Sequence, residues 1–248
     1  MLSDIEAILF DLGDTLVSYP VPRWPIMARR CLAGVYGYLV RPEAELPPPA
    51  AAVPGPEEAR ARRAVPGPDT ALPHRVMLAL RRVVRSISGR TLPRMAEACT
   101  RPLVADGRLF ADALPTILAL RGRGYRLGLV SNTPWGTPDY LWERQVERFA
   151  LAPHFEVRIF SSVIGFRKPD ARIFKAALQR LGVAAGRALF VGNDPQADIE
   201  GAQDAGLRAA LIARPGYDTA AAANVRPDLR VRTLTELLAH LPGPAKIG

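Results

Sequence analysis

Four apolar runs of the sequence are each followed by a side chain that could take part in chemistry. In chain order, the pairs are run 7–10 with Asp11, run 125–130 with Ser131, run 156–160 with Lys168, and run 188–191 with Asn193, Asp194 and Asp198. Carboxylates suit a hard divalent cation such as Mg²⁺, whereas an ammonium and a hydroxyl suit anionic oxygens. If these segments meet at one place, this mixture of charges predicts chemistry on a phosphate group, whose own negative charge must be offset before a carboxylate can approach it.

The four runs belong to a longer alternation of strand and helix patterns. Strands are predicted at 7–10, 125–130, 156–160, 188–191 and 208–213, and helices at 113–124, 138–151, 171–182, 197–206 and 233–240. Near-continuous apolar strands separated by helices are typical of a parallel sheet covered on both faces. The predicted fold class is therefore α/β, a three-layer Rossmann-like sandwich. In such a fold, ligands bind beyond the carboxyl ends of the strands, where the reactive residues lie.

A long insert interrupts this pattern after the first strand. Residues 18–108 contain helical patterns at 26–39, 74–88 and 92–104 and no convincing strand, and residues 41–73 are rich in Pro and Ala. We predict a core of residues 1–17 and 109–248 and a helical cap domain of residues 18–108, with 41–73 as a flexible segment. The insert is either a plain helical excursion or a lid over the residues that follow the first strand.

Composition excludes several classes of protein. The 248 residues are 48% hydrophobic, and no apolar run approaches the roughly 18 residues of a membrane span. The formal net charge of +9 comes mostly from arginines spread along the chain, without a compact basic block, so we expect affinity for small anions and no nucleic acid or membrane partner. Acids near the N-terminus and two cysteines, Cys31 and Cys99, without metal-ligand spacing favour free thiols and a cytoplasmic location. Nothing in the sequence indicates an oligomeric state.

The motifs, taken in order, resemble those of the haloacid dehalogenase-like (HAD) hydrolases. The resemblance rests on "FDLGDTL", "LVSNT", "GFRKPDARIF" and "FVGNDPQADIEGAQDAG", and it covers about residues 5–17 and 111–213. It implies a Mg²⁺-dependent phosphohydrolase that cleaves a small phosphate monoester, a phosphorylated metabolite, through an aspartyl-phosphate intermediate. The insert matches the helical cap of the family only in its position and helical character.

The resemblance also implies a role for each motif residue. Asp11 would be the nucleophile, and its carboxylate would bind Mg²⁺ together with the backbone carbonyl of Gly13. The Ser131 hydroxyl and the Asn132 amide would bind the phosphoryl group, and Lys168 would offset the charge on phosphate and on Asp11. The acidic cluster would complete the metal site. Asp194 would bind the metal directly or through water, and Asn193, in place of the commoner Asp, is a further candidate. Asp198 would orient this site from behind the direct ligands of the metal or pair with Lys168.

Gly13 departs from the phosphatase pattern. Most phosphatases of the family carry a second Asp at this place, which protonates the leaving group and then activates water. Loss of a general acid or base costs about 10² to 10⁴ in rate. Asp14 could replace it, although a residue in this position more often caps backbone amides. Two alternatives therefore stay open: a 2-haloacid dehalogenase, in which an aromatic residue usually stands at this place, and a non-catalytic binding module of the same fold.

Overall fold

The computed structural model describes residues 2, 4–19, 104–133, 137–215 and 225–242, together with the single positions 30, 33, 34, 37, 94, 97, 98, 100 and 101. The chain divides into two compact units. The first consists of Met1–Ser18, Arg108–Asn132 and Glu143–Gly248, and the second of Tyr19–Gly107 and Thr133–Trp142. In the second unit, the described positions within the predicted helices 26–39 and 92–104 are helical. The predicted helix 74–88 and the Pro- and Ala-rich segment 41–73 lie outside the described residues.

The first unit is built on a six-stranded sheet in the order β5-β4-β1-β6-β7-β8, and every neighbouring pair is parallel. The strands are β1 (Ala7–Phe10), β4 (Arg126–Ser131), β5 (Val157–Phe160), β6 (Ala188–Gly192), β7 (Arg208–Ile212) and β8 (Leu229–Val231). The five predicted strands are confirmed to within a residue or two. Strand β8 was missed because its sequence alternates polar and apolar residues, and only Val231 of the three is buried.

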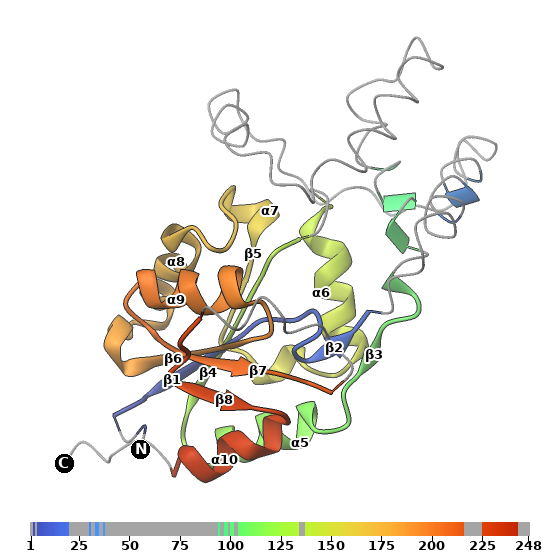
Figure 1. Ribbon diagram of the computed structural model, residues 1–248. Helices are drawn as coiled ribbons and strands as arrows, with labels where there is room; N and C mark the ends of the chain where they lie inside the picture. The colour runs from blue at the N-terminus through green and yellow to red at the C-terminus, as the bar shows by residue number, and fades with distance from the viewer. Residues whose placement is uncertain are drawn as a thin grey trace. The chain divides into compact units, whose positions relative to one another are not determined.

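Helices cover both faces of this sheet, which gives the predicted three layers (Figure 1). The described helices of four or more residues are α5 (Ala113–Gly122), α6 (Asp139–Arg148), α7 (Ser161–Ile164), α8 (Ala171–Leu181), the π-helical turn η5 (Pro195–Glu200), α9 (Gly201–Asp204) and α10 (Leu237–His240). Helices α8 and α9 lie on one face of the sheet, and α5 and α10 lie on the other. Short 3₁₀ turns occupy Ala152–His154 (η3), Ala185–Arg187 (η4) and Leu234–Glu236 (η7). None of the described helices is long and apolar enough to cross a bilayer.

The hydrophobic core between the sheet and α8 fixes the position of this helix and of the loop before it. Alternate residues of the central strands, such as Leu9 and Phe190, pack with Phe174 and Leu178 of α8. The rings of Phe174 and Phe190 meet edge to face at 5.0 Å, a preferred aromatic geometry. Helix α8 begins at Asp170, whose carboxylate accepts a hydrogen bond from the Arg172 amide, and it ends at Gly182, whose φ of 63° suits glycine. These signals place the "RKP" segment directly before a well-anchored helix.

A two-stranded antiparallel sheet follows the loop after β1. Strand β2 (Val17–Ser18) pairs antiparallel with β3 (Arg108–Leu109). Between β1 and β2, the amides of Leu16 and Val17 both donate to the Leu12 carbonyl, at 3.0 and 2.9 Å. Residues 12–16, hereafter the β1 loop, therefore form a tight turn at the carboxyl end of the central strand.

Candidate active site

Asp11 lies at the carboxyl end of β1, the strand at which the order of the sheet reverses. The chain adds β4 and β5 on one side of β1 and then β6, β7 and β8 on the other. The Asp11 amide donates to the Val191 carbonyl at 2.9 Å, so its backbone extends the pairing with β6. Asp11 is only 7% exposed. A crevice at such a switch point is the usual ligand site of a parallel sheet.

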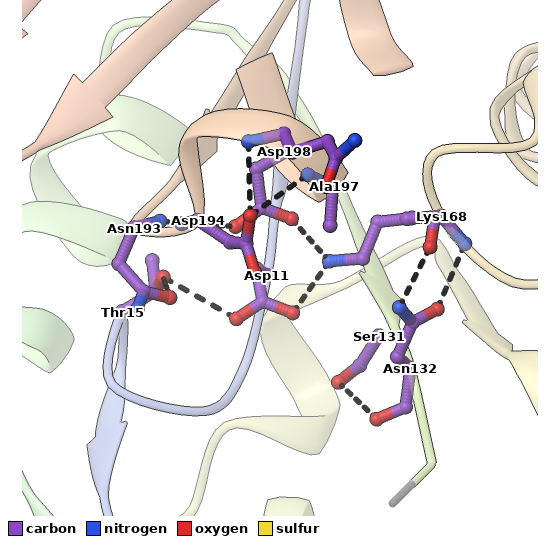
Figure 2. A network of polar contacts seen from close by, with 10 residues as sticks. Asp11, Thr15, Ser131, Asn132, Lys168, Asn193, Asp194, Ala197 and Asp198 are labelled. Carbon is purple, nitrogen blue, oxygen red and sulfur yellow. Dashed lines mark hydrogen bonds and ion pairs between the residues drawn. The ribbon is translucent and has the colours of Figure 1, made fainter. Parts of the chain in front are cut away.

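Lys168 joins two carboxylates at this edge. Its Nζ lies 2.6 Å from Asp11 Oδ1 and 2.6 Å from Asp198 Oδ1. Figure 2 shows the ammonium between the two carboxylates. The side chains of Lys168 and Asp198 are 2% and 1% exposed, whereas that of Asp11 is 10% exposed. The prediction that Asp198 pairs with Lys168 therefore agrees with this geometry, and Asp11 is the more exposed of the two carboxylates.

Backbone amides hold Asp198 in place. Its Oδ2 accepts hydrogen bonds from the amides of Asn193 and Asp194, at 3.0 and 2.9 Å. Gly192 allows this approach, because a Cβ there would overlap the Asp198 carboxylate and lie 2.5 Å from its Cβ. Gly201 has a similar role, because a Cβ there would lie 2.7 Å from Pro169 Cα. Gly192 thus lets η5 pack closely against the end of β6, and Gly201 lets α9 pack closely against the segment that carries Lys168.

We expect Gly192→Ala to destabilise the protein by about 1–3 kcal/mol, because overpacking beside Asp198 forces a backbone or side-chain shift. The same shift moves the partner of Lys168, so activity should fall as well. Gly186→Ala is the matched control, since a Cβ there meets nothing within 4 Å. Urea denaturation of the two variants measures the difference, and equal stability would contradict the packing argument.

Asn132 fixes the backbone of Lys168. The Lys168 amide donates to Asn132 Oδ1 at 2.9 Å, and Asn132 Nδ2 donates to the Lys168 carbonyl at 3.1 Å. The neighbouring Ser131, 4% exposed at the end of β4, makes a long contact of 3.4 Å from its hydroxyl to the Asn132 carbonyl. The side chain of Asn132 is thus engaged in the loop of Lys168, while its predicted role in phosphate binding rests on its backbone amide and stays a prediction.

Thr15 is a site residue that the sequence analysis missed. It is fully buried, and its hydroxyl lies 3.3 Å from Asp11 Oδ2 and 3.2 Å from Asn193 Oδ1 (Figure 2). A hydroxyl has one hydrogen and can donate to only one of these oxygens. With the hydrogen on the Asp11 side, rotation of the Asn193 amide would let its Nδ2 donate to Thr15. The available signal was position: Thr15 comes four residues after Asp11 in the first motif.

The remaining predicted residues surround this centre in different ways. Asp194 Oδ1 accepts from the amides of Gln196 and Ala197, at 2.9 and 2.8 Å, and so caps η5. Asp14 has a φ of 56° and donates its amide to the Val17 carbonyl at 2.7 Å; aspartate tolerates this left-handed conformation better than most residues. The roles of Asp194 as a metal ligand and of Asp14 as a proton donor stay predictions.

The charges of the centre are unequal, because one ammonium is shared between two carboxylates. Burial disfavours the charged form of Lys168, but Asp11 and Asp198 together raise its pKa above the ordinary value. Burial raises the pKa of Asp198 to about 6; the Lys168 ion pair opposes this rise, and the charge on Asp11 adds to it. Asp198 therefore takes up a proton at a higher pH than an ordinary aspartate does.

The raised pKa of Asp198 predicts how stability depends on pH. Between its ordinary value of 3.8 and about 6, the folded protein binds more protons at this site than the unfolded chain does. This contribution to the free energy of unfolding therefore decreases as pH rises through that window. We expect the wild type to gain stability relative to Asp198→Asn on going from about pH 7.5 to about pH 5. Urea denaturation in EDTA measures this, and a pH-independent difference would contradict the assignment.

The oxygen atoms next to Asp11 suit a hard cation. In the part of the chain that the structure describes, no three or more Asp, Glu, His or Cys side chains are arranged to hold a metal ion. The Thr15 hydroxyl lies 3.3 Å from Asp11 Oδ2, and the Asn193 side-chain oxygen lies 3.2 Å from that hydroxyl. Carboxylate, amide and hydroxyl oxygens are ligands compatible with Mg²⁺. The oxygens of Asp11 and Asn193 are chemically compatible with a magnesium ion, and the metal-binding roles of Asp11, Asn193 and Asp194 stay predictions.

Comparison with known proteins identifies the family. The family model of the haloacid dehalogenase-like hydrolases matches residues 5–206. The chain therefore belongs to the haloacid dehalogenase-like hydrolases, as the motifs predicted.

Two curated relatives are phosphatases. The chain is 38% identical over 105 residues to a glyceraldehyde 3-phosphate phosphatase of Methanothermobacter thermautotrophicus. The aligned region covers 42% of this chain and 45% of the relative. It is 39% identical over 129 residues to a phosphoserine phosphatase of Thermus thermophilus, covering 52% of this chain and 49% of the relative. The matched region thus spans about half the length of these relatives.

Solved structures extend the likeness to nearly the whole chain. A HAD phosphatase from Thermococcus onnurineus is 25% identical with a TM-score of 0.61, and the match covers 97% of this chain and 99% of that one. A 2-haloacid dehalogenase from Pseudomonas syringae is 26% identical with a TM-score of 0.60, covering 95% and 97%. Because both activities occur at nearly the same structural similarity, the choice between them depends on the site.

Proposed function

We propose that the protein is a phosphatase that hydrolyses a small phosphate monoester with Asp11 as the nucleophile. The carrying observation is the Asp11 carboxylate at the carboxyl end of the central strand, 2.6 Å from the ammonium of a buried lysine. The named activities of the two curated relatives support a phosphoryl substrate, and both names refer to three-carbon phosphate esters. We therefore propose a substrate of similar size, and we assign residues 18–108 as the cap that selects it.

The proposed reaction has two steps. An Asp11 oxygen attacks phosphorus, a bond from that oxygen to phosphorus forms, and the bond to the leaving oxygen breaks. Water then attacks the aspartyl phosphate, which releases inorganic phosphate and restores the carboxylate. Lys168 offsets negative charge beside Asp11 throughout, and Ser131 lies at the end of the neighbouring strand, where its hydroxyl can donate to a phosphoryl oxygen. A magnesium ion held by Asp11 and Asn193 would supply further positive charge for the phosphoryl oxygens when bound.

Gly13 determines which esters should react fastest. The leaving oxygen needs a proton when it is a basic alkoxide but not when it is a phenolate, and Gly13 has no side chain to supply one. Gly13 is not among the positive-φ glycines of the described residues, so a side chain is conformationally compatible there. We therefore propose that the protein favours esters with good leaving groups unless Asp14 supplies the proton.

The test is phosphate release from p-nitrophenyl phosphate, glyceraldehyde 3-phosphate and phosphoserine, each with and without Mg²⁺. The proposal expects metal-dependent turnover, with alkyl esters slower than the aryl ester. Gly13→Asp should accelerate the alkyl esters selectively, and Gly13→Asn, of the same size without the acid, should not. The absence of turnover of every ester would contradict the proposal.

Asn193 favours one alternative, the 2-haloacid dehalogenase. Its amide stands where the phosphatases of the family commonly have a metal-binding carboxylate, and dehalogenases of the family need no metal. Chloride release from a 2-chloroalkanoate is therefore the parallel assay. Calorimetric titration with Mg²⁺ separates the two activities without turnover: the phosphatase proposal expects binding that Asn193→Asp strengthens, because a second carboxylate joins the site.

A further inference from the structure

The buried ion pair between Arg214 and Asp112 lies outside the catalytic motifs. Arg214 follows β7 and is 9% exposed. Its Nη1 and Nη2 donate to Asp112 Oδ2 and Oδ1 at 3.1 and 2.9 Å, a bidentate geometry. The guanidinium carbon lies 3.7 Å from the centroid of the Phe110 ring. Arg214 is thus held from two sides.

Asp112 gives up its ordinary local role in this arrangement. It occupies the N-cap position of α5, where an aspartate usually accepts hydrogen bonds from the first amides of the helix, yet its side chain makes no capping bond. The carboxylate instead binds Arg214, and its Oδ2 also accepts from the Leu234 amide at 2.8 Å. The Asp112 carboxylate therefore orients Arg214 instead of capping α5.

The remaining contact of Arg214 leads to the β1 loop. Its Nη2 donates to the Thr15 carbonyl at 3.0 Å. Thr15 is also the residue whose hydroxyl lies 3.3 Å from Asp11 Oδ2. A continuous path of hydrogen bonds therefore runs from Asp112 through Arg214 and Thr15 to the carboxylate of Asp11.

We propose that Arg214, oriented by Asp112, is a positioning residue that fixes the β1 loop and, through Thr15, the orientation of Asp11. The catalytic part of this inference rests on the proposed phosphatase activity, whereas the ordering of the loop does not. Misplacement of a reacting group by about 1 Å can cost about 10²-fold in rate. Residue 214 therefore affects kcat although it belongs to none of the catalytic motifs.

The test compares Arg214→Lys with Arg123→Lys. Lysine keeps the charge but loses the fork that reaches Asp112 and Thr15 together. Arg123 is the matched control, because it also donates to backbone carbonyls, those of Leu238 and Leu241, but joins α5 to the C-terminal helix instead. For p-nitrophenyl phosphate, we expect kcat of Arg214→Lys to fall about 10- to 100-fold with KM within about twofold. The kcat of Arg123→Lys should stay near that of the wild type.

Hydrogen exchange provides a readout that needs no turnover. The amides of Asp14, Leu16 and Val17 are hydrogen bonded within the loop region, so their exchange reports its opening. In Arg214→Lys they should exchange about tenfold faster, while the amides of α8 stay unchanged. If the wild type cleaves no phosphate ester, the proposed function fails, and exchange alone decides whether Arg214 orders the loop.

Asp112→Asn gives a second route if Arg214→Lys does not fold, since asparagine keeps an oxygen for the Leu234 amide and weakens the ion pair. It should show the same faster exchange, and combining the two substitutions should reduce kcat no further than the stronger one alone. Unchanged kcat and unchanged loop exchange in Arg214→Lys, with only a lower Tm, would overturn the proposal. Equal losses of kcat in Arg214→Lys and Arg123→Lys would also overturn it.

Discussion

Asp11→Asn is expected to reduce phosphate release by at least about 10³-fold, because the amide cannot attack phosphorus and form the covalent intermediate. The fold should persist, since Lys168 keeps its ion pair with Asp198 at 2.6 Å. Asp204→Asn is the control for a charge change on the surface, because Asp204 is exposed on α9. Steady-state rates and thermal unfolding of the three proteins measure both effects. Residual turnover within tenfold of the wild type would remove Asp11 from the role of nucleophile.

Phosphate release from alkyl and aryl esters also tests whether Asp14 supplies the proton of the leaving group. Asp14 lies in the same loop, three residues after Asp11. If it supplies the proton, Asp14→Asn should slow alkyl esters by about 10²- to 10⁴-fold and leave the aryl ester nearly unchanged. A uniform effect on both classes of ester would instead indicate that Asp14 acts only through the conformation of the turn.

Lys168→Met is expected to destabilise the protein by about 3–5 kcal/mol, because removing one partner of a buried ion pair leaves uncompensated charge. Here two carboxylates, Asp11 and Asp198, would lose their shared ammonium. The loss should shrink as pH falls and Asp198 becomes protonated, and it should be smaller in Lys168→Met combined with Asp198→Asn.

Lys175→Met is the matched control, since Lys175 is exposed on α8 and the same substitution there should change stability by less than about 0.5 kcal/mol. Urea denaturation at two pH values measures these differences. Similar stability of the two single variants would show that Lys168 is not required to neutralise the centre. Activity should be absent from Lys168→Met at every pH, because the charge beside Asp11 is no longer offset.

The central strands and the motif positions could be predicted from sequence because each signal is local. Apolar runs in β1 and β6 are continuous, and their burial on both faces follows from composition alone. That Asp11 and Lys168 lie at the same edge of the sheet agrees with the rule that parallel strands end at one edge. The pairing of Lys168 with Asp198 was one of two possibilities that the motif resemblance left open. The distances in this centre do not follow from the sequence, because they depend on how closely Gly192 and Gly201 let neighbouring segments approach.

The roles of Thr15, Asn132 and Arg214 could not be read from the sequence for a different reason. Threonine after a turn and asparagine after a strand are common for local hydrogen bonding, and neither residue type indicates its distant partner. The side chain of Asn132 binds a residue 36 positions away. Arg214 offered a weak signal, a single charge directly after an apolar strand, but its contact to Thr15 spans 199 positions. Such partners are set by the assembled fold.

Because Lys168 is buried, the rate at which its amine is chemically modified reports how often the centre around it opens. The chain has lysines only at 168, 175 and 246, and the Lys168 side chain is 2% exposed, enclosed by two carboxylates and lying 5.0 Å from the centroid of the Phe190 ring. An amine-reactive reagent can modify Lys175 on the surface of the native protein. It can reach Lys168 only when the surroundings of this buried side chain open. The ratio of the two labelling rates therefore follows how often the centre opens, without any substrate present.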